Sequence, residues 1–223
     1  HSSTIVMNMP SGLWTESPTP ANLLAFGDPA FPPNYPRLEH SATEVKNIAS
    51  LFEPSAADVF TQMEASEQRI KDMPLDAYRY IHFATHGTVD EVVPDFSSLV
   101  LAPDPDRNED GLLQAWEIAG LQMNAEMVVL SACQTGLGKM VRGEGLVGLT
   151  QSLIYSGASS VIVSLWSVAD HSTSDIMTSL YHHLIIDEMD KSISLQKAKH
   201  SMLEDVDLAH PFYWAPFILI GNR

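Results

Sequence analysis

The sequence predicts an α/β fold in which a mainly parallel sheet is flanked by helices on both faces. Short apolar runs alternate along the chain with longer stretches whose apolar residues recur at helical spacing, and this alternation is typical of parallel strands joined by crossover helices. Several runs are apolar at every position, which indicates strands buried on both faces. The 223 residues, 45% of them apolar, are enough for one globular domain with a single core.

The first half of the chain contains a lead-in and one βαβα unit. Residues 1–22, rich in Ser, Thr and Pro, are expected to be irregular with at most a short edge strand, and residues 23–223 to form the folded domain. A central strand, a helix, a short edge strand and a second helix are predicted, in that order, at Leu23–Gly27, residues 41–51, Asp58–Phe60 and Ala65–Met73. Ser41 or Thr43 is the expected N-cap of the first helix.

The second half continues the alternation. A strand is expected from Tyr80 toward Gly87, followed by part of a hairpin at Ser98–Leu101, a solvated turn region and a short packed segment, which together wall a cleft. The next buried strand is Met127–Leu130. Beyond a glycine-rich loop at residues 136–145 we expect a helix, a strand, two helices and a closing strand, at Leu146–Tyr155, Ser160–Leu165, residues 172–186, Ser194–Leu203 and Pro216–Ile220.

Two of the apolar runs end in reactive side chains. YIHFATHG (80–87) ends at His86 and Gly87, and EMVVLSACQTG (126–136) carries Cys133, the only cysteine. The carboxyl ends of strands in open α/β sheets face the ligand crevice, and a crossover of this size lets two parallel strands lie side by side with their ends level. Either residue alone has an ordinary interpretation, as a small buried thiol or a satisfied loop histidine. Together they favour nucleophilic catalysis, with His86 as base for Cys133 and acid for a leaving amine.

Composition narrows the class of protein. The formal net charge of −16 argues against nucleic acid as a direct partner, because phosphate binding needs a basic face. The acidic excess either keeps the protein in solution or steers a basic substrate. No apolar run reaches the roughly 18 residues of a membrane span, and a single cysteine excludes an internal disulfide. We therefore expect a soluble cytoplasmic protein without a membrane partner, excised from a longer chain because it starts at a residue other than methionine.

Two other motifs carry less weight. GEGLVG (143–148) matches G-x-G-x-x-G, but the dinucleotide fingerprint requires its first glycine directly after a strand, and 12 residues, 131–142, separate the two here. His182, His183 and His200 lack an i, i+4 pairing with a third ligand, so zinc is not expected. The sequence thus predicts neither a cofactor nor a metal.

Seven segments together resemble the CHAT domain, a caspase-like peptidase family related to separase. The resemblance runs over nearly the whole chain in the family's order and rests on LLAFGDPAF (23–31), SATEVKNIASLF (41–52), HFATHG (82–87), LSACQTG (130–136), GEGLVGL (143–149), SLWSVAD (164–170) and HPFYWAPFILIG (210–221). It implies a caspase-hemoglobinase fold with a His86/Cys133 dyad. It also implies that the backbone N–H groups of Gly87 and Cys133 bind the oxyanion, and that helical repeats precede the domain in the full-length protein.

The resemblance leaves the substrate pocket open. Ser131, two residues before the cysteine, occupies a position that lines the pocket in several caspase-like relatives, some of which carry an acid there. Asp170 and Trp166 are implied to lie beside the same pocket. Two interpretations stay open: the pocket is neutral, or it accepts a basic substrate side chain that pairs with the Asp170 carboxylate.

The function that this pattern favours is a cysteine endopeptidase acting on a specific protein substrate, as the regulated catalytic domain of a larger protein. One alternative is a catalytically weak interaction or sensing module on the same fold. Another is a small-molecule amidase or acyltransferase that uses the same dyad. The loop at residues 136–145 is expected to rearrange around Cys133 and to make activity depend on a partner.

Overall fold

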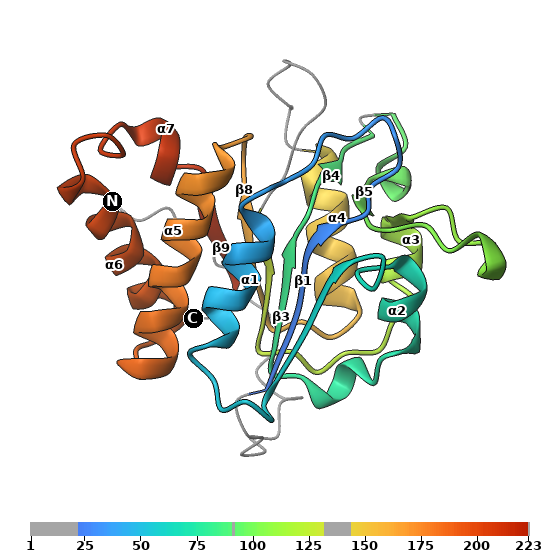
Figure 1. The fold of residues 1–223 in the computed structure, drawn as a ribbon, viewed down its shortest axis with the longest axis horizontal. Coiled ribbons are helices and arrows are strands. Elements are labelled where there is room, and N and C mark those ends of the chain that lie inside the picture. Colours follow the sequence, from blue (N-terminus) through green and yellow to red (C-terminus); the bar gives the residue numbers. More distant parts are fainter. Residues whose placement is uncertain (1–21, 91, 132–143, 223) are drawn as a thin grey trace.

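The computed structural model describes residues 22–90, 92–131 and 144–222, and a six-stranded sheet forms their centre (Figure 1). The strand order is β2-β1-β3-β7-β8-β9, with bounds Ala57–Gln62, Leu23–Pro29, Tyr80–Ala84, Met127–Leu130, Ser160–Ser164 and Phe217–Gly221. All neighbouring strands pair in parallel except β8 and β9, which are antiparallel. The predicted fold class, a mainly parallel sheet between helices, is confirmed.

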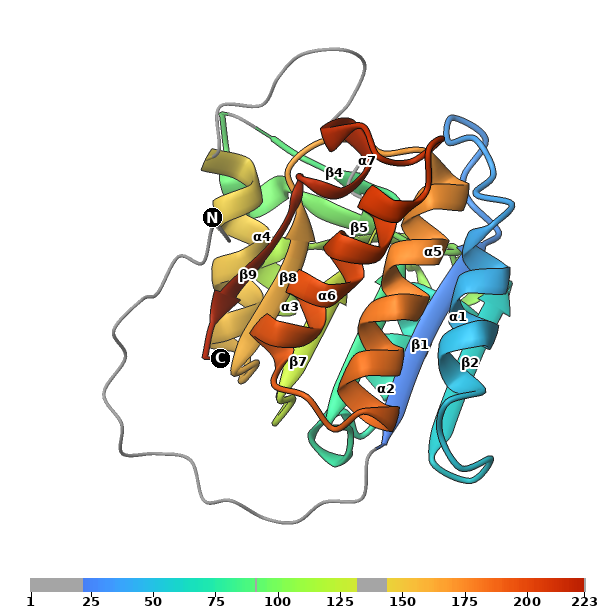
Figure 2. The ribbon, with the colours of Figure 1, turned by 90° about the vertical axis from the view of Figure 1, so that its left-hand side faces the viewer.

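Helices cover both faces of this sheet. Figure 2 shows α1 (Ser41–Ala49), α5 (Asp170–Tyr181) and α6 (Lys191–Glu204) side by side in front of the strands. The opposite face carries α2 (Glu67–Asp72), α3 (Ala115–Ile118) and α4 (Glu144–Tyr155). Because successive strand side chains point to opposite faces, the apolar runs supply two cores at once: Leu24 and Phe26 belong to one core and Leu23 and Ala25 to the other.

A second, smaller sheet follows directly after β3. It consists of β4 (Gly87–Thr88), β5 (Ser98–Val100) and β6 (Leu112–Gln114), paired antiparallel in that order. The predicted hairpin at residues 98–101 is therefore present, with β4 as a strand that the sequence pattern missed. Short helical turns complete the connections, namely η1 (Leu75–Ala77), η2 (Pro94–Phe96), η3 (Pro105–Arg107) and α7 (Pro211–Trp214).

The capping prediction for α1 was wrong. Ser41 is the first residue of the helix and His40 is the N-cap, without a side-chain cap bond. The hydroxyl of Ser41 is buried, donates to the Leu38 carbonyl at 2.9 Å and accepts the Asp28 N–H at 2.7 Å. It therefore ties α1 to the end of β1. A Cβ at Gly27 would lie 2.6 Å from the Ser41 carbonyl oxygen, so glycine permits this close approach.

Several element ends also differ from expectation. Strand β1 continues two residues past Gly27, through a register shift at Asp28, whose φ of 45° is left-handed. The helix expected over residues 172–186 ends at Tyr181 and passes into a π-helical turn, η4 (His182–Ile186). Helix α2 starts at Glu67, because the Ser66 side chain accepts the Arg69 N–H as N-cap. Among the described residues, no helix combines the length and apolarity of a membrane span.

Candidate active site

The candidate site lies at the carboxyl ends of β3 and β7, which are neighbours in the sheet. Their paired residues, such as Phe83 and Leu130, are 47 positions apart (130 − 83), the same separation as His86 and Cys133. The Ser131 N–H extends this ladder by donating to the Phe83 carbonyl at 3.0 Å. Cys133 itself lies outside the described residues. At Ser131, two residues before the cysteine, the chain thus still lies beside the carboxyl end of β3.

His86 is held in a defined orientation. Its Nε2 lies 2.7 Å from the carbonyl oxygen of Pro36, and because a carbonyl can only accept, Nε2 carries the proton. The rings of Phe31 and Tyr35 lie 4.6 Å and 5.8 Å from the imidazole. The side chain is fully buried, and its Nδ1 has no hydrogen-bond partner among the described residues. A neutral His86 therefore presents a free lone pair on Nδ1.

The electrostatics of the site favour this neutral form. Burial lowers the pKa of His86 below the ordinary value of histidine, although the hydrogen bond to Pro36 and the nearby Asp170 carboxylate act in the opposite direction. A lowered histidine pKa means that the unprotonated ring dominates at neutral pH. The imidazole can thus accept a proton from a neighbouring nucleophile.

The orienting carbonyl of Pro36 was not foreseen. The stretch at residues 29–36 is rich in proline, which is typical of a loop, and every residue carries a carbonyl, so no residue type could signal this contact. The loop folds back from the end of β1 to cover the end of β3. It supplies the ring partners Phe31 and Tyr35 as well as the acceptor.

The other predicted site residues lie at the same end of the sheet with different surroundings. Asp170 is the first residue of α5, and its Oδ2 accepts the His40 N–H at 2.7 Å. Burial raises the pKa of Asp170, with the His40 N–H opposing the shift. Trp166 follows β8, and its Nε1 donates to the Phe212 carbonyl at 3.0 Å. Its indole N–H is therefore engaged with α7.

Ser131 and Gly87 are both buried. The hydroxyl of Ser131 lies 3.4 Å from the Phe83 carbonyl oxygen, so it points back toward β3. Gly87 begins β4 and pairs with Leu99, which fixes the backbone directly after His86 in the second sheet.

Asp28 is a further acidic residue at this end, and it was not among the predicted site residues. Its carboxylate is 1% exposed and receives two parallel hydrogen bonds from Arg37, at 3.0 Å from Nε to Oδ1 and 2.7 Å from Nη2 to Oδ2. A hollow of about 170 Å³ lies over this pair and is lined by Phe31 and Tyr35. The same two rings flank His86, so the hollow adjoins the candidate site. The signal in the sequence is an acid at the carboxyl end of a central strand.

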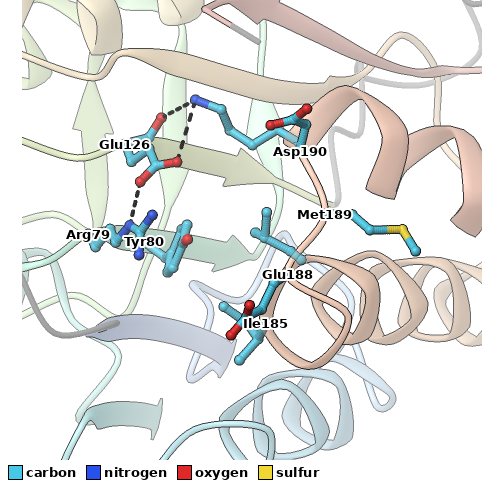
Figure 3. A pocket seen from close by; sticks show the side chains of 9 residues that line it. Arg79, Tyr80, Glu126, Ile185, Glu188, Met189 and Asp190 are labelled. Carbon is cyan, nitrogen blue, oxygen red and sulfur yellow. Dashed lines mark hydrogen bonds and ion pairs between the residues drawn. The ribbon is translucent and has the colours of Figure 1, made fainter. Parts of the chain in front are cut away.

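A larger hollow, of about 400 Å³, lies at the opposite ends of these strands (Figure 3). There the Glu126 carboxylate binds Arg79 and lies 4.0 Å from Lys191 Nζ, which also donates to the Glu126 carbonyl at 3.2 Å. Burial lowers the pKa of Lys191. These contacts join the starts of β3, β7 and α6, and we assign them a structural role.

Potential metal ligands gather at two places in the described part of the chain, and both lie outside the site around His86. One is formed by Glu67, Glu109 and Glu117, and Lys71 already occupies it with its Nζ 2.7–2.9 Å from each carboxylate. The other is on η4.

Comparison with known proteins identifies similar sequences. The CHAT domain family matches residues 10–222 of the chain. Tetratricopeptide repeat protein 28 of Mus musculus and of Homo sapiens are each 32% identical over 111 residues, which is 50% of this chain. The matched part spans only 4% of the length of these relatives.

Solved structures share the fold at low sequence identity. Gingipain R, an Arg-specific cysteine proteinase, superposes with a TM-score of 0.56 at 10% identity, over 91% of this chain and 46% of its own. Separase in the Saccharomyces cerevisiae separase–securin complex superposes with a TM-score of 0.56 at 12% identity, over 91% of this chain and 12% of its own. The RgpB pro- and mature-domain complex of Porphyromonas gingivalis gives a TM-score of 0.57 at 12% identity, over 91% and 47%. At these identities the likeness concerns the fold, which is that of caspase-like cysteine proteases.

Proposed function

The chain belongs to the CHAT domain family, and we propose that it is a cysteine endopeptidase with Cys133 as nucleophile and His86 as general base and acid. The observation that carries this proposal is the register of β3 and β7. Its 47-residue offset equals the separation of the two residues, and both residues come directly after the carboxyl ends of these neighbouring strands. The Nδ1 of His86, which has no hydrogen-bond partner in the part of the chain that the structure describes, supplies the proton acceptor that the thiol requires.

We propose the following reaction. Nδ1 of His86 takes the Cys133 thiol proton as Sγ attacks the scissile carbonyl carbon. The N–H groups of Gly87 and Cys133 stabilise the resulting oxyanion. The C–N bond then breaks, and the leaving amine takes the proton from His86. Water, deprotonated by His86, finally hydrolyses the thioester and restores the thiol. The Pro36 carbonyl keeps the imidazole in the tautomer that these reaction steps need, with the proton on Nε2.

The pocket for the residue before the scissile bond has two interpretations. Ser131 and Trp166 favour a neutral pocket, whereas Asp170 favours a basic side chain. Asp28 strengthens the basic option, because the hollow beside His86 already holds a guanidinium, that of Arg37, in two-bond contact with its carboxylate. For a substrate arginine to bind there, Arg37 has to move, and its 64% exposed side chain is free to do so.

We further propose that the domain works as the regulated part of a longer cytoplasmic protein with helical repeats upstream. The single cysteine fits a reducing compartment. The curated relatives are tetratricopeptide repeat proteins in which the matched segment is a small fraction of the length. The alternative is an interaction or sensing module without turnover, which the same fold can support.

Labelling by an electrophilic peptide warhead separates the two functions. The full-length protein, wild type and with His86→Ala or Cys133→Ala, is incubated with the warhead and analysed by mass spectrometry. We expect selective modification of Cys133 that falls sharply in His86→Ala. Absence of labelling in the full-length protein, together with absence of cleavage of any member of a peptide library, identifies the interaction module instead.

A further inference from the structure

A π-helical turn at the end of α5 gathers three metal-ligating side chains, of which an α-helix would bring only His183 and Asp187, four residues apart, onto one face. In an α-helix each residue turns by about 100°, so residues five apart lie on different sides. In η4 (His182–Ile186) the Asp187 N–H donates to the His182 carbonyl at 3.2 Å, a bond between residues five apart. The wider turn brings Asp187 back beneath His182.

The ligand atoms of this cluster already lie close together. The Oδ2 of Asp187 is 2.6 Å from Nδ1 of His183 and 3.8 Å from Nδ1 of His182. One ligand atom from each residue lies within 4.8 Å of the other two. Bound zinc takes His nitrogens at about 2.0–2.1 Å and carboxylate oxygens at about 2.0–2.2 Å, so ligand atoms in a tetrahedral site stand a little over 3 Å apart. Small rotamer changes would therefore open this cluster around an ion.

The cluster is also accessible. The side chains of His182, His183 and Asp187 are 51%, 22% and 34% exposed, so an ion can enter without opening the fold. His183 lines a hollow of about 540 Å³ beside α6, in which water can fill the remaining coordination positions. Two imidazoles and a carboxylate suit zinc and related divalent transition metals better than Mg²⁺ or Ca²⁺, which prefer oxygen ligands.

We propose that His182, His183 and Asp187 form a binding site for a divalent transition-metal ion, with zinc as the best fit. The site is separate from the candidate active site, because α5 runs about 18 Å along its 12 residues from Asp170, near His86, to η4. It does not depend on peptidase activity. A bound ion joins the end of α5 to the connection that leads into α6, and only the folded chain presents all three ligands.

The competing explanation is a plain surface ion pair. Asp187 already accepts a hydrogen bond from His183, and the nearby Lys197 is a second positive neighbour. Such a pair needs only His183 and Asp187. His182 Nδ1 also lies 3.8 Å from the same carboxylate oxygen, so three ligand atoms face one point, as a metal site requires.

Calorimetric titration with Zn²⁺ at pH 7.5 tests the site. We compare the wild-type protein with His182→Ala, His183→Ala and Asp187→Asn, and with His200→Ala as a control from the same hollow. Loss of a ligand should weaken Zn²⁺ binding by at least about 10–100-fold, the range known for outer-shell partners, while His200→Ala should change it little. A Cys133→Ala background removes the thiol as a competing ligand. Circular dichroism of the metal-free variants checks that each is folded, which is expected because all three residues are partly exposed.

A thermal shift gives the second measurement. At a Zn²⁺ concentration about 100-fold above the dissociation constant, the melting temperature should rise by roughly 5–10 °C, and this rise should vanish in each of the three ligand variants. One-to-one binding that survives His182→Ala, or that His200→Ala weakens as strongly as His183→Ala does, would overturn the proposal, as would absence of binding to the wild-type protein.

Discussion

Replacing His82 by alanine is expected to destabilise the fold strongly and to leave the chemistry around His86 unchanged. His82 is the central residue of β3 and His86 follows the end of that strand, and His82 points into the core between the sheet and α1. Its Nε2 is 2.7 Å from Oε1 of Glu44, and the two side chains are 0% and 1% exposed. His82 is the hydrogen-bond partner of the Glu44 carboxyl group in the described part of the chain.

The size of the effect follows from this burial. Alanine leaves the Glu44 carboxyl group inside the protein without a partner, and breaking a buried pair of this kind costs about 3–5 kcal/mol of unfolding free energy. For a domain of this size each kcal/mol lowers the melting temperature by about 2–4 °C, so the expected decrease is roughly 6–20 °C. His86→Ala leaves one carbonyl acceptor without its donor, at a cost of about 1–3 kcal/mol.

Differential scanning calorimetry combined with a cleavage assay at low temperature checks this contrast. His82→Ala should melt earlier and still cleave while folded, whereas His86→Ala should stay more stable and lose cleavage. The double variant Glu44→Leu/His82→Leu, which removes both partners, should recover much of the stability. A His82→Ala protein that melts within 2 °C of the wild type, or a double variant less stable than His82→Ala, would refute the reasoning.

Four other changes test the proposed site. Cys133→Ala should lower kcat by roughly 10⁴-fold or more with little change in melting temperature, and retained cleavage would exclude the mechanism. Because burial lowers the pKa of His86, kcat/KM should hold to below pH 6.5 and fall only at more acidic pH as the ring gains a proton. The same shift means that the unfolded chain binds this proton more readily, so stability should decrease as pH falls through about 6.5. A peptide-library profile should lose any preference for Arg or Lys in Asp28→Asn or Asp170→Ala, and a profile unchanged in both identifies a neutral pocket. Alanine in place of the glycines at 136–145, which lie largely outside the described residues, should alter activation by the upstream region, and full activity of the isolated domain in both forms would contradict regulation by this loop.

Local patterns in the sequence determined the architecture. Runs that are apolar at every position mark strands covered on both sides, and the helical spacing between them marks the covering helices, because burial depends on the periodicity of each element. Both signals are contained within about ten residues. They predicted the central strands, helix α6 and the edge position of β2, all of which the structure contains.

The same local patterns identified His86 and Cys133 as candidate site residues. Both follow apolar runs, and the carboxyl end of a parallel strand is where ligands bind. The separation of 47 residues could be counted in the sequence, but only the pairing of β3 with β7 made it a register. The roles of both residues stay a prediction, as do those of Ser131, Trp166 and Asp170.

Contacts between distant or unremarkable groups were decided only by the tertiary structure. The Pro36 carbonyl that orients His86 lies 50 positions from it and has no residue signature. Glu44 and His82 are 38 positions apart, and neither residue type indicates the other as its partner. Asp28 and Arg37 meet because the backbone turns left-handed after Gly27. The cluster of His182, His183 and Asp187 depends on a π-helical turn, and helical spacing in the sequence assumes 3.6 residues per turn. In each case the deciding quantity is a distance that arises only when the elements pack, and residue types alone do not encode it.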